Sequence, residues 1–288
     1  MGYSESPNSQ KSTAVKHVIN NSPPRLASQR SRLRLAGKVA LLMSGGGRID
    51  RKIASVYAQQ GASIVLCGLD FGRGTKVSDQ LKAAGGKARF VLTDVSNPDD
   101  VKMAVDETVA TYGHLDILIN HCQVLTQQDA AVQTLRPQVW DRMIEVALRG
   151  TFLSVQQALP FLIRSDSGSV INIAPTPQLP GGLATAVSRS SLLTMTEAMS
   201  RSLAGYAIRV NLIWPEAATS PEPPQTTPAI GLPRRSTYVM TRSDSCPNRA
   251  IARAALYLAC EDSQALNGSA IRVRAPIPIH VHRTAAAS

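Results

Sequence analysis

Short apolar runs rich in Val, Ile and Leu recur along this chain from about Leu35 toward its C-terminal end. They are residues 39–43, 64–67, 89–92, 117–120, 170–173, 208–213 and 271–273. Runs of this length and composition are typical of parallel strands buried on both faces. The pattern therefore predicts a parallel sheet that is covered on both sides.

Apolar residues at helical spacing lie between these runs. They are Ile53, Val56 and Tyr57; Val101 and Val105; Met143 and Val146; and Leu192, Met195, Met199 and Leu203. We interpret these stripes as the core-facing sides of helices. Alternation of strands and helices requires right-handed crossover connections. The sequence thus predicts an α/β fold, a doubly wound parallel sheet with helices on both faces, over residues 35–275.

Three segments depart from the alternation. Residues 1–34 hold six Lys or Arg against the single acidic Glu5, and their Ser-rich, Pro-broken composition predicts a disordered basic tail. A transit peptide has a similar composition, but Pro23 and Pro24 interrupt any amphipathic helix there. The Pro-rich stretch 215–249 predicts a long loop, either a binding lid or disordered. Residues 276–288 predict a frayed tail.

Composition narrows the functional class. The net charge of +11 suggests nucleic acid, but much of the excess lies in the first 34 residues, so nucleic-acid binding is disfavoured. The longest apolar runs are strand-length, which predicts no membrane span. The four cysteines show no metal-ligand spacing, which favours free thiols in a reducing compartment. We therefore expect a cytoplasmic protein without a metal site.

A glycine-rich turn follows the first predicted strand. Gly45, Gly46 and Gly47 separate that strand from a helical pattern that begins near Arg48. In α/β nucleotide-binding folds, such a turn holds a pyrophosphate on backbone N–H groups and on the helix N-terminus.

This order of elements resembles the short-chain dehydrogenase/reductase superfamily in its classical form. The matching segments are Asp94-Val95, 118–120, Trp140 with 148–151, 168–173, 208–211 with Pro215, 252–259 and 267–269. The resemblance implies a Rossmann-type domain, an NAD(P) cofactor and oxidoreductase chemistry. It also implies self-association, because helices after the fourth and fifth strands pair with a twin subunit in that family. Segments 140–159 and 190–203 are apolar enough for this, so we expect a homodimer or homotetramer.

The turn departs from the family pattern Thr-Gly-x-x-x-Gly-x-Gly, whose marked positions fall on Met43, Ser44, Arg48 and Asp50. Serine in place of glycine costs about 1 kcal/mol if position 44 needs a positive φ. Asp50 weakens cofactor binding more, because its carboxylate would occupy the position of the pyrophosphate itself. At ~5 Å and an effective dielectric near ~20, it repels a unit negative charge by about 3 kcal/mol. Arg48 can offset this by pairing with a phosphate or with Asp50.

The positions that would bind the cofactor ribose also depart from the family pattern. Cys67-Gly68-Leu69-Asp70 lacks the acidic residue that binds an NAD ribose at Gly68 and the Arg for an NADP phosphate at Leu69. By resemblance, the residues left to contact a cofactor are Ser44, Arg48, Ile49, Asp94 and Asn120. We therefore expect NAD(P) binding to be weak or absent.

The family's catalytic Asn, Ser, Tyr and Lys fall on Ala147, on Ala174 or Pro175, on Thr185 and on Arg189. Thr185 is shorter and far less acidic than the phenol that exchanges the substrate proton. Losing a positioned acid/base removes roughly 10²- to 10⁴-fold of rate. Arg189 keeps a positive charge but is no simple substitute for lysine.

Several functions stay open. A pseudo-enzyme or scaffold fits the departures from the cofactor and catalytic motifs. The alternative is a divergent NAD(P)-dependent oxidoreductase, or a repurposed isomerase or cyclase that binds a small molecule in the pocket where the family binds its substrate. The related halohydrin dehalogenases use Ser, Tyr and Arg, and the missing Tyr argues against that chemistry. His121 and Cys122 can do new acid/base or nucleophilic work, although adjacent strand residues point apart and favour a structural role. Thr176 offers a displaced hydroxyl.

Overall fold

The computed structural model describes residues 33–44, 46–124, 128–176, 182–216, 237–240 and 247–274, of which 237–240 by their backbone alone. The tails predicted at 1–34 and 276–288 lie outside this set except for residues 33 and 34. Most of the predicted lid lies outside it as well.

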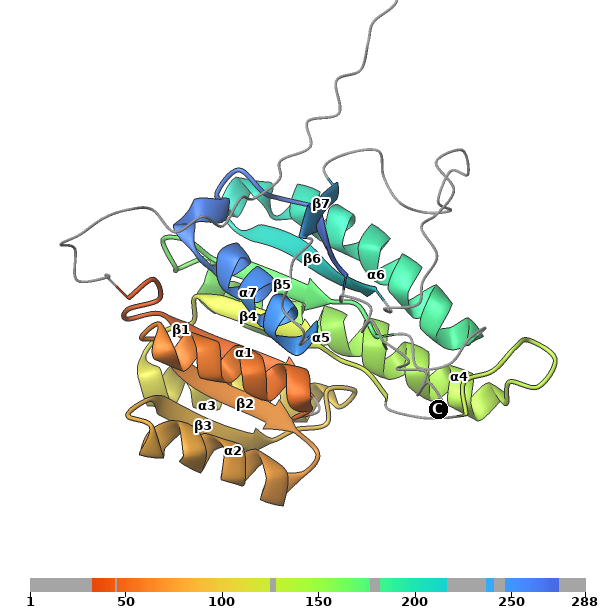
Figure 1. Ribbon diagram of the computed structural model, residues 1–288, viewed down its shortest axis with the longest axis horizontal. Coiled ribbons are helices and arrows are strands. Elements are labelled where there is room, and N and C mark those ends of the chain that lie inside the picture. Colours follow the sequence, from red (N-terminus) through yellow and green to blue (C-terminus); the bar gives the residue numbers. More distant parts are fainter. Residues whose placement is uncertain are drawn as a thin grey trace, which may run out of the picture.

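The strands form one parallel sheet in the order β3-β2-β1-β4-β5-β6-β8-β7 (Figure 1). Their bounds are β1 Val39–Ser44, β2 Ser63–Gly68, β3 Lys87–Leu92, β4 Ile117–His121, β5 Ser169–Ile173, β6 Arg209–Glu216, β7 Thr237–Met240 and β8 Ala270–Arg274. All seven apolar runs of the sequence correspond to strands of this sheet. The order reverses between β1 and β4, and ligands of open α/β sheets bind at such a switch point, beyond the carboxyl ends of the strands.

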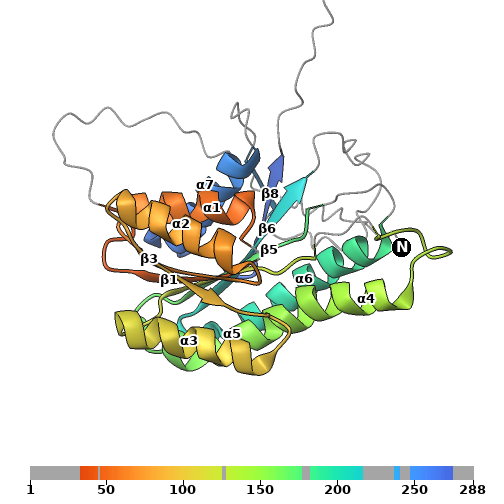
Figure 2. The ribbon, with the colours of Figure 1, turned by 90° about the horizontal axis from the view of Figure 1, so that it is seen from below.

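Helices cover both faces of the sheet, which confirms the predicted doubly wound α/β fold. Their bounds are α1 Arg48–Gln59, α2 Phe71–Ala83, α3 Pro98–Tyr112, α4 Pro137–Ile144, α5 Gly150–Leu162, α6 Leu183–Ser202 and α7 Pro247–Ala259. Figure 2 shows α1, α2 and α7 on one face and α3 to α6 on the other. No helix in the described ranges is long and apolar enough to cross a membrane.

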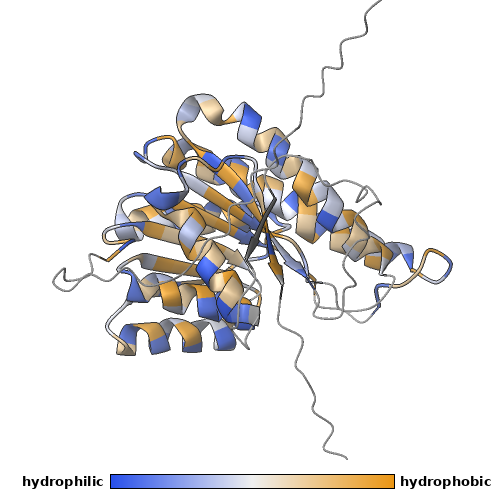
Figure 3. Ribbon diagram, turned by 45° about the horizontal axis from the view of Figure 1, so that its top comes forward, coloured by the Kyte–Doolittle hydropathy of each residue, from blue (hydrophilic) through white to orange (hydrophobic). Residues whose placement is uncertain are grey.

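Two main clusters of apolar side chains form the core, one on each face of the sheet. Successive residues of β1 alternate between them: Leu42 packs toward α1 and α7, whereas Leu41 packs toward α3 and α5. Figure 3 shows the hydrophobic colouring concentrated along the strands and on the sides of the helices that face them. Most residues of the predicted helical stripes pack in these two clusters, with Ile53 and Val101 fully buried, whereas Leu192 and Met195 pack in a third cluster beside β6.

The Pro-rich stretch 215–249 contains more regular structure than the expected loop. β6 continues to Glu216, β7 adds a short parallel strand beside β8, and α7 already begins at Pro247. Position 216 is strand because its backbone pairs in register with Arg274 of β8. The sequence missed β7 because its four residues lie among prolines without a longer apolar run.

Candidate functional site

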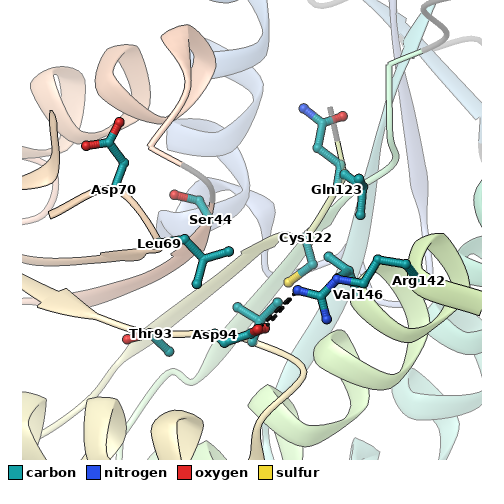
Figure 4. Close-up of a pocket in the computed structure, with 12 residues that line it drawn as sticks. Ser44, Leu69, Asp70, Thr93, Asp94, Cys122, Gln123, Arg142 and Val146 are labelled. Atoms are coloured by element: carbon teal, nitrogen blue, oxygen red, sulfur yellow. Dashed lines mark hydrogen bonds and ion pairs between the residues drawn. The ribbon is translucent and has the colours of Figure 1, made fainter. Parts of the chain in front are cut away.

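A pocket of about 380 Å³ opens at the carboxyl ends of β1 to β4 (Figure 4). Its walls are contributed by the strand ends, by α4 and by the segment between α4 and α5. The lining residues are Ser44, Gly68, Leu69, Asp70, Thr93, Asp94, Val95, Cys122, Gln123, Val124, Arg142 and Val146. The surface of the pocket is mostly apolar, and its polar side chains are those of Ser44, Asp70, Thr93, Asp94, Gln123 and Arg142.

The glycine-rich turn lies next to this pocket. Ser44 ends β1 in an extended conformation and is 3% exposed. The positive φ of the turn, 68°, is at Gly46, and Gly47 is the N-cap of α1. The strain that we considered for Ser44 therefore does not arise, because the glycine two residues later takes the left-handed conformation.

Asp50 turns back from the first helical turn onto the N-cap. Its Oδ2 accepts the backbone N–H of Gly47 at 2.7 Å, and its Oδ1 lies 2.5 Å from Nδ1 of His121. Asp50 and His121 are each only 2% exposed. Arg48, which we had considered as a partner for Asp50, is exposed and makes no ion pair within the described part of the chain. The buried carboxylate therefore takes an N–H of the turn and is held from the other side by an imidazole.

His121 and Cys122 point apart, as adjacent residues at a strand end were predicted to do. His121 pairs in register with Ser44 and faces α1, whereas Cys122 belongs to the core cluster on the opposite face of the sheet. The Cys122 thiol donates to the carbonyl of Met43 at 3.7 Å. Burial raises the pKa of Cys122 to about 12, so the thiol is protonated at neutral pH and is a poor nucleophile.

An ion pair between Asp94 and Arg142 crosses the floor of the pocket (Figure 4). The guanidinium of Arg142 lies 3.0 Å from Asp94 Oδ2 and donates to the Ser96 hydroxyl at 2.7 Å. Partial burial alone would raise the pKa of Asp94, but hydrogen bonds from Ser96 and Arg142 outweigh it and lower that pKa below its ordinary value. The sequence did not indicate Arg142, because nothing local marks it apart from other helix-surface arginines.

The position that resembles the catalytic Asn lies in a distorted helix. Residues Glu145–Arg149 form a π-helical segment between α4 and α5, with the buried Ala147 at its centre. Such single-turn distortions are frequent at functional sites. The alanine side chain, however, has no polar group that could contact a substrate or a water molecule.

The remaining catalytic positions lie around the start of α6. Ala174 and Pro175 are buried directly after β5, and Thr185 lies in the first turn of α6. The carboxylate of Asp129 accepts the backbone N–H groups of Ala184 at 3.0 Å and of Thr185 at 2.9 Å. Asp129 thus caps α6 from the loop after β4, a contact across 56 residues that the sequence did not reveal.

Arg189 is a buried brace. Its guanidinium donates to the carbonyl oxygens of Pro175 and of Pro215, the latter at 2.7 Å, and stacks at 4.2 Å over the ring of Trp214. Burial lowers the pKa of Arg189 to about 10, so it stays protonated at neutral pH. The guanidinium ties the ends of β5 and β6 together and is not among the residues that line the pocket.

The five predicted cofactor residues are only partly brought together. Ser44 and Asp94 line the pocket, Arg48 faces solvent, and Ile49 packs against the core. Asn120 is fully buried, and its amide donates to Asn172 at 3.0 Å. This pair continues to the Thr196 hydroxyl at 2.9 Å, so it links the sheet to α6 rather than facing the pocket.

Thr176 is the displaced hydroxyl that the sequence offered near the catalytic Ser position. Its backbone N–H donates to Oε1 of Gln123 at 3.2 Å, which joins it to the pocket rim. Its hydroxyl is buried and has no hydrogen-bond partner in the described part of the chain. The structure therefore brings Thr176 to the edge of the site, beside the side-chain amide of Gln123.

Comparison with known proteins agrees with the geometry. The sequence model of the family described as Enoyl-(Acyl carrier protein) reductase matches residues 48–275. The chain is 26% identical over 247 residues to 3-oxoacyl-[acyl-carrier-protein] reductase FabG of Thermotoga maritima, covering 84% of this chain and 98% of that protein. It is 30% identical over 191 residues to (+)-borneol dehydrogenase 2 of Salvia officinalis, covering 65% and 67%.

Solved structures show the same fold. A short-chain dehydrogenase/reductase from Serratia marcescens superimposes with a TM-score of 0.69 at 26% identity, covering 85% of this chain and 99% of that one. A short-chain type dehydrogenase/reductase from Mycobacterium marinum gives 0.70 at 22% identity, covering 86% and 98%. The chain belongs to the short-chain dehydrogenase/reductase superfamily.

Proposed function

We propose that this chain is a non-redox member of its superfamily, a pseudo-enzyme or scaffold that binds nicotinamide nucleotides weakly or not at all. One observation carries the proposal. The carboxylate of Asp50 accepts the N–H of Gly47 in the glycine-rich turn, where a pyrophosphate would need that N–H and a positive environment.

Electrostatics set the size of the effect. A carboxylate ~5 Å from a pyrophosphate charge, at an effective dielectric near ~20, costs about 3 kcal/mol, which is more than a hundredfold in affinity. The exposed side chain of Arg48 offsets little of this, because solvent screens its charge.

The catalytic positions support the same proposal. Thr185 has its backbone N–H bonded to Asp129, and Arg189 is committed to two backbone carbonyls. Ala147 and Ala174 supply no polar side chain at all. Without a group that titrates and reaches a substrate oxygen, the positions cannot perform the proton transfer that hydride transfer to a carbonyl requires.

Binding of NAD(H) and NADP(H) tests this proposal by calorimetry and by thermal unfolding. Millimolar nucleotide should hardly raise the Tm of the unmodified protein, since a ligand stabilises only as RT ln(1 + [L]/Kd). Asp50→Gly, alone or with Ser44→Gly, should recover measurable affinity without recovering hydride transfer. Asp99→Asn is the matched control, because it removes an exposed acid from the first turn of α3 and should leave affinity unchanged. Micromolar affinity of the unmodified protein would refute the proposal.

The second candidate is a divergent oxidoreductase or a repurposed isomerase or cyclase. It is favoured by the pocket of about 380 Å³, which keeps the polar groups of Asp94, Arg142 and Gln123 among apolar walls. A substrate of such an enzyme would contact these groups. Tight binding of intact NAD(P)(H) would favour the oxidoreductase, whereas binding of an apolar small molecule without nucleotide would favour the repurposed enzyme.

We further propose that the chain forms a homodimer or homotetramer through α5 and α6. Phe152 on α5 is 47% exposed, and a groove of about 480 Å³ lies along α6. The groove is lined by Leu148, Ser190, Ser191, Thr194, Met195 and Ala198. Self-association would bury this face in a two-fold contact. Light scattering at micromolar concentration should give a multiple of 30.7 kDa, and a monomer mass would contradict the proposal.

A further inference from the structure

The buried pair of Asp50 and His121 is used by neither the pocket nor the catalytic positions. The two residues come from the first turn of α1 and from the last residue of β4, and neither lines the described pocket. Both oxygens of the carboxylate are engaged, one by the Gly47 N–H and the other by Nδ1 of His121. The carboxylate is thus held from two sides at an exposure of 2%.

Chemistry fixes the roles within the pair. A carboxylate oxygen only accepts hydrogen bonds, so Nδ1 of His121 carries the proton that lies between the two side chains. A buried charge is strongly unfavourable unless it is paired and hydrogen-bonded. In the described part of the chain, the imidazole is the one side chain that hydrogen-bonds or ion-pairs with Asp50.

The second ring nitrogen of His121 also shows that the histidine is not explained by packing. Nε2 of His121 is buried and has no partner among the described residues. An apolar side chain at this position would avoid that cost, so packing alone does not account for histidine. The hydrogen bond to Asp50 is the one interaction in the described structure that an imidazole makes here and a leucine would not.

The fold explains why position 121 can do this. β4 lies beside β1, and His121 is in register with Ser44, the residue that leads into the glycine-rich turn. A side chain on this face at the end of β4 therefore meets the start of α1. The N-terminus of that helix, with its free N–H groups and positive dipole end, attracts a negative charge.

We infer that His121 is a positioning residue that holds Asp50 as an internal plug in the anion-binding turn. The Gly47 N–H of the turn is satisfied without a ligand. A phosphate-bearing molecule must break the His121–Asp50 contact before it can bind there. This inference rests on the proposed function and adds the residue that keeps the carboxylate in place.

A double-mutant cycle without any nucleotide tests the coupling. Asp50→Asn, His121→Leu and the double variant are unfolded in urea, and the unfolding equilibrium constants are compared. Each single change should raise that constant by about tenfold or more, and the double variant by clearly less than the product, with a coupling factor of about ten. Coupling near one would overturn the inference.

His114→Leu is the matched control for the cycle. His114 also approaches an aspartate, with Nε2 3.2 Å from Oδ2 of Asp116, but its side chain is 51% exposed. Because solvent screens the exposed imidazole, the unfolding constant should change by less than about threefold. A change as large as that of His121→Leu would show that any histidine–aspartate contact has this effect, and would count against a special role for His121.

A spectroscopic readout on the unmodified protein keeps the test decisive if a variant fails to fold. In ¹⁵N-labelled protein, the proton on Nδ1 of His121 should give a downfield, slowly exchanging signal, and its absence would overturn the inference. Addition of inorganic pyrophosphate should leave the signal unchanged in the unmodified protein and should raise the Tm of Asp50→Gly only.

Nucleotide binding separates the two proposals. If the unmodified protein binds NAD(H) and loses the His121 signal, the proposed function fails and the plug stands. If it binds NAD(H) or pyrophosphate while the signal persists, the plug itself is refuted. If the coupling is absent and nucleotide still does not bind, the plug fails and the proposed function stands.

Discussion

Beside β1 to β4 the carboxyl edge of the sheet opens into a pocket, whereas beside β5 and β6 the charged side chains of Arg189 and Asp129 are bound to the protein's own backbone. In the first region the ion pair of Asp94 and Arg142 lines a pocket of about 380 Å³. In the second, Arg189 donates to two carbonyls, and Asp129 accepts two N–H groups of α6. The first region has kept room for a ligand, while the second uses its polar groups for stability.

This difference bears on the proposed loss of hydride-transfer chemistry. A catalytic group must stay available to a substrate, and groups that are fully hydrogen-bonded within the protein are not. Arg189, at the position that resembles the family's Lys, donates to two backbone carbonyls. Asp50, at the start of α1, accepts an N–H of the glycine-rich turn. Under the proposed function, both residues make an internal contact where a ligand contact would be needed.

The largest expected effect on stability comes from Arg189→Leu, which removes the contacts that join the ends of β5 and β6. The change leaves the carbonyls of Pro175 and Pro215 without their donor and removes the stacking on Trp214. Unsatisfied buried acceptors cost about 1–3 kcal/mol each, so we expect a loss of about 3 kcal/mol in the free energy of unfolding. Urea denaturation measures it.

Arg189→Lys separates the contribution of the positive charge from that of the two hydrogen bonds. A lysine keeps the charge but cannot serve both carbonyls with a planar fork, so part of the loss, about 1–2 kcal/mol, should remain. If either variant lost less than ~0.5 kcal/mol, the guanidinium would not be a brace, and the contrast between the two regions would disappear.

Asp129→Ala is expected to have the next effect. It removes the acceptor for two N–H groups at the start of α6, and loss of such a cap costs about 1–2 kcal/mol. The matched control is Asp70→Ala, which removes a half-exposed cap from α2 and should cost less, because water can replace it. Equal losses for the two variants would show that burial of Asp129 adds nothing.

The sequence predicted the sheet and its two covered faces because that information is local. Each strand is an apolar run, and each core helix repeats its apolar residues at helical spacing, as in Ile53 and Tyr57. The acid in the first turn of α1 was also visible locally, since Asp50 lies three residues after Gly47 of the glycine-rich turn. Its chemical importance could therefore be inferred before its position was known.

The partners of these residues could not be predicted because they come from distant elements. Asp50 meets His121 across 71 residues, and Asp94 meets Arg142 across 48. Only the register of β1 and β4, with Ser44 opposite His121, brings the first pair together. Sequence patterns report burial and spacing along one element, whereas these contacts depend on how two elements pack. A register argument from the aligned strand ends is the signal that could have found the pairing of His121 with Asp50.

The smallest expected effect comes from Arg142→Leu, in the open region. Asp94 and Arg142 are partly exposed, and such pairs contribute about 0–1 kcal/mol, so the free energy of unfolding should fall by no more than this. Because the pKa of Asp94 is lowered in the folded protein, the ion pair stabilises fully above the ordinary pKa of an aspartate, about 3.9. Its contribution is lost as the pH falls through the lower pKa of the folded state.

The difference between Arg142→Leu and the unmodified protein should therefore be constant near neutral pH and shrink toward zero in acid. Urea denaturation at pH 7 and at about pH 3 measures it, with the Asp94 titration followed by NMR. In the variant the pKa of Asp94 should rise toward its ordinary value. A loss of stability as large as that of Arg189→Leu would show that the pocket wall is also a structural brace, and the two regions would then be alike.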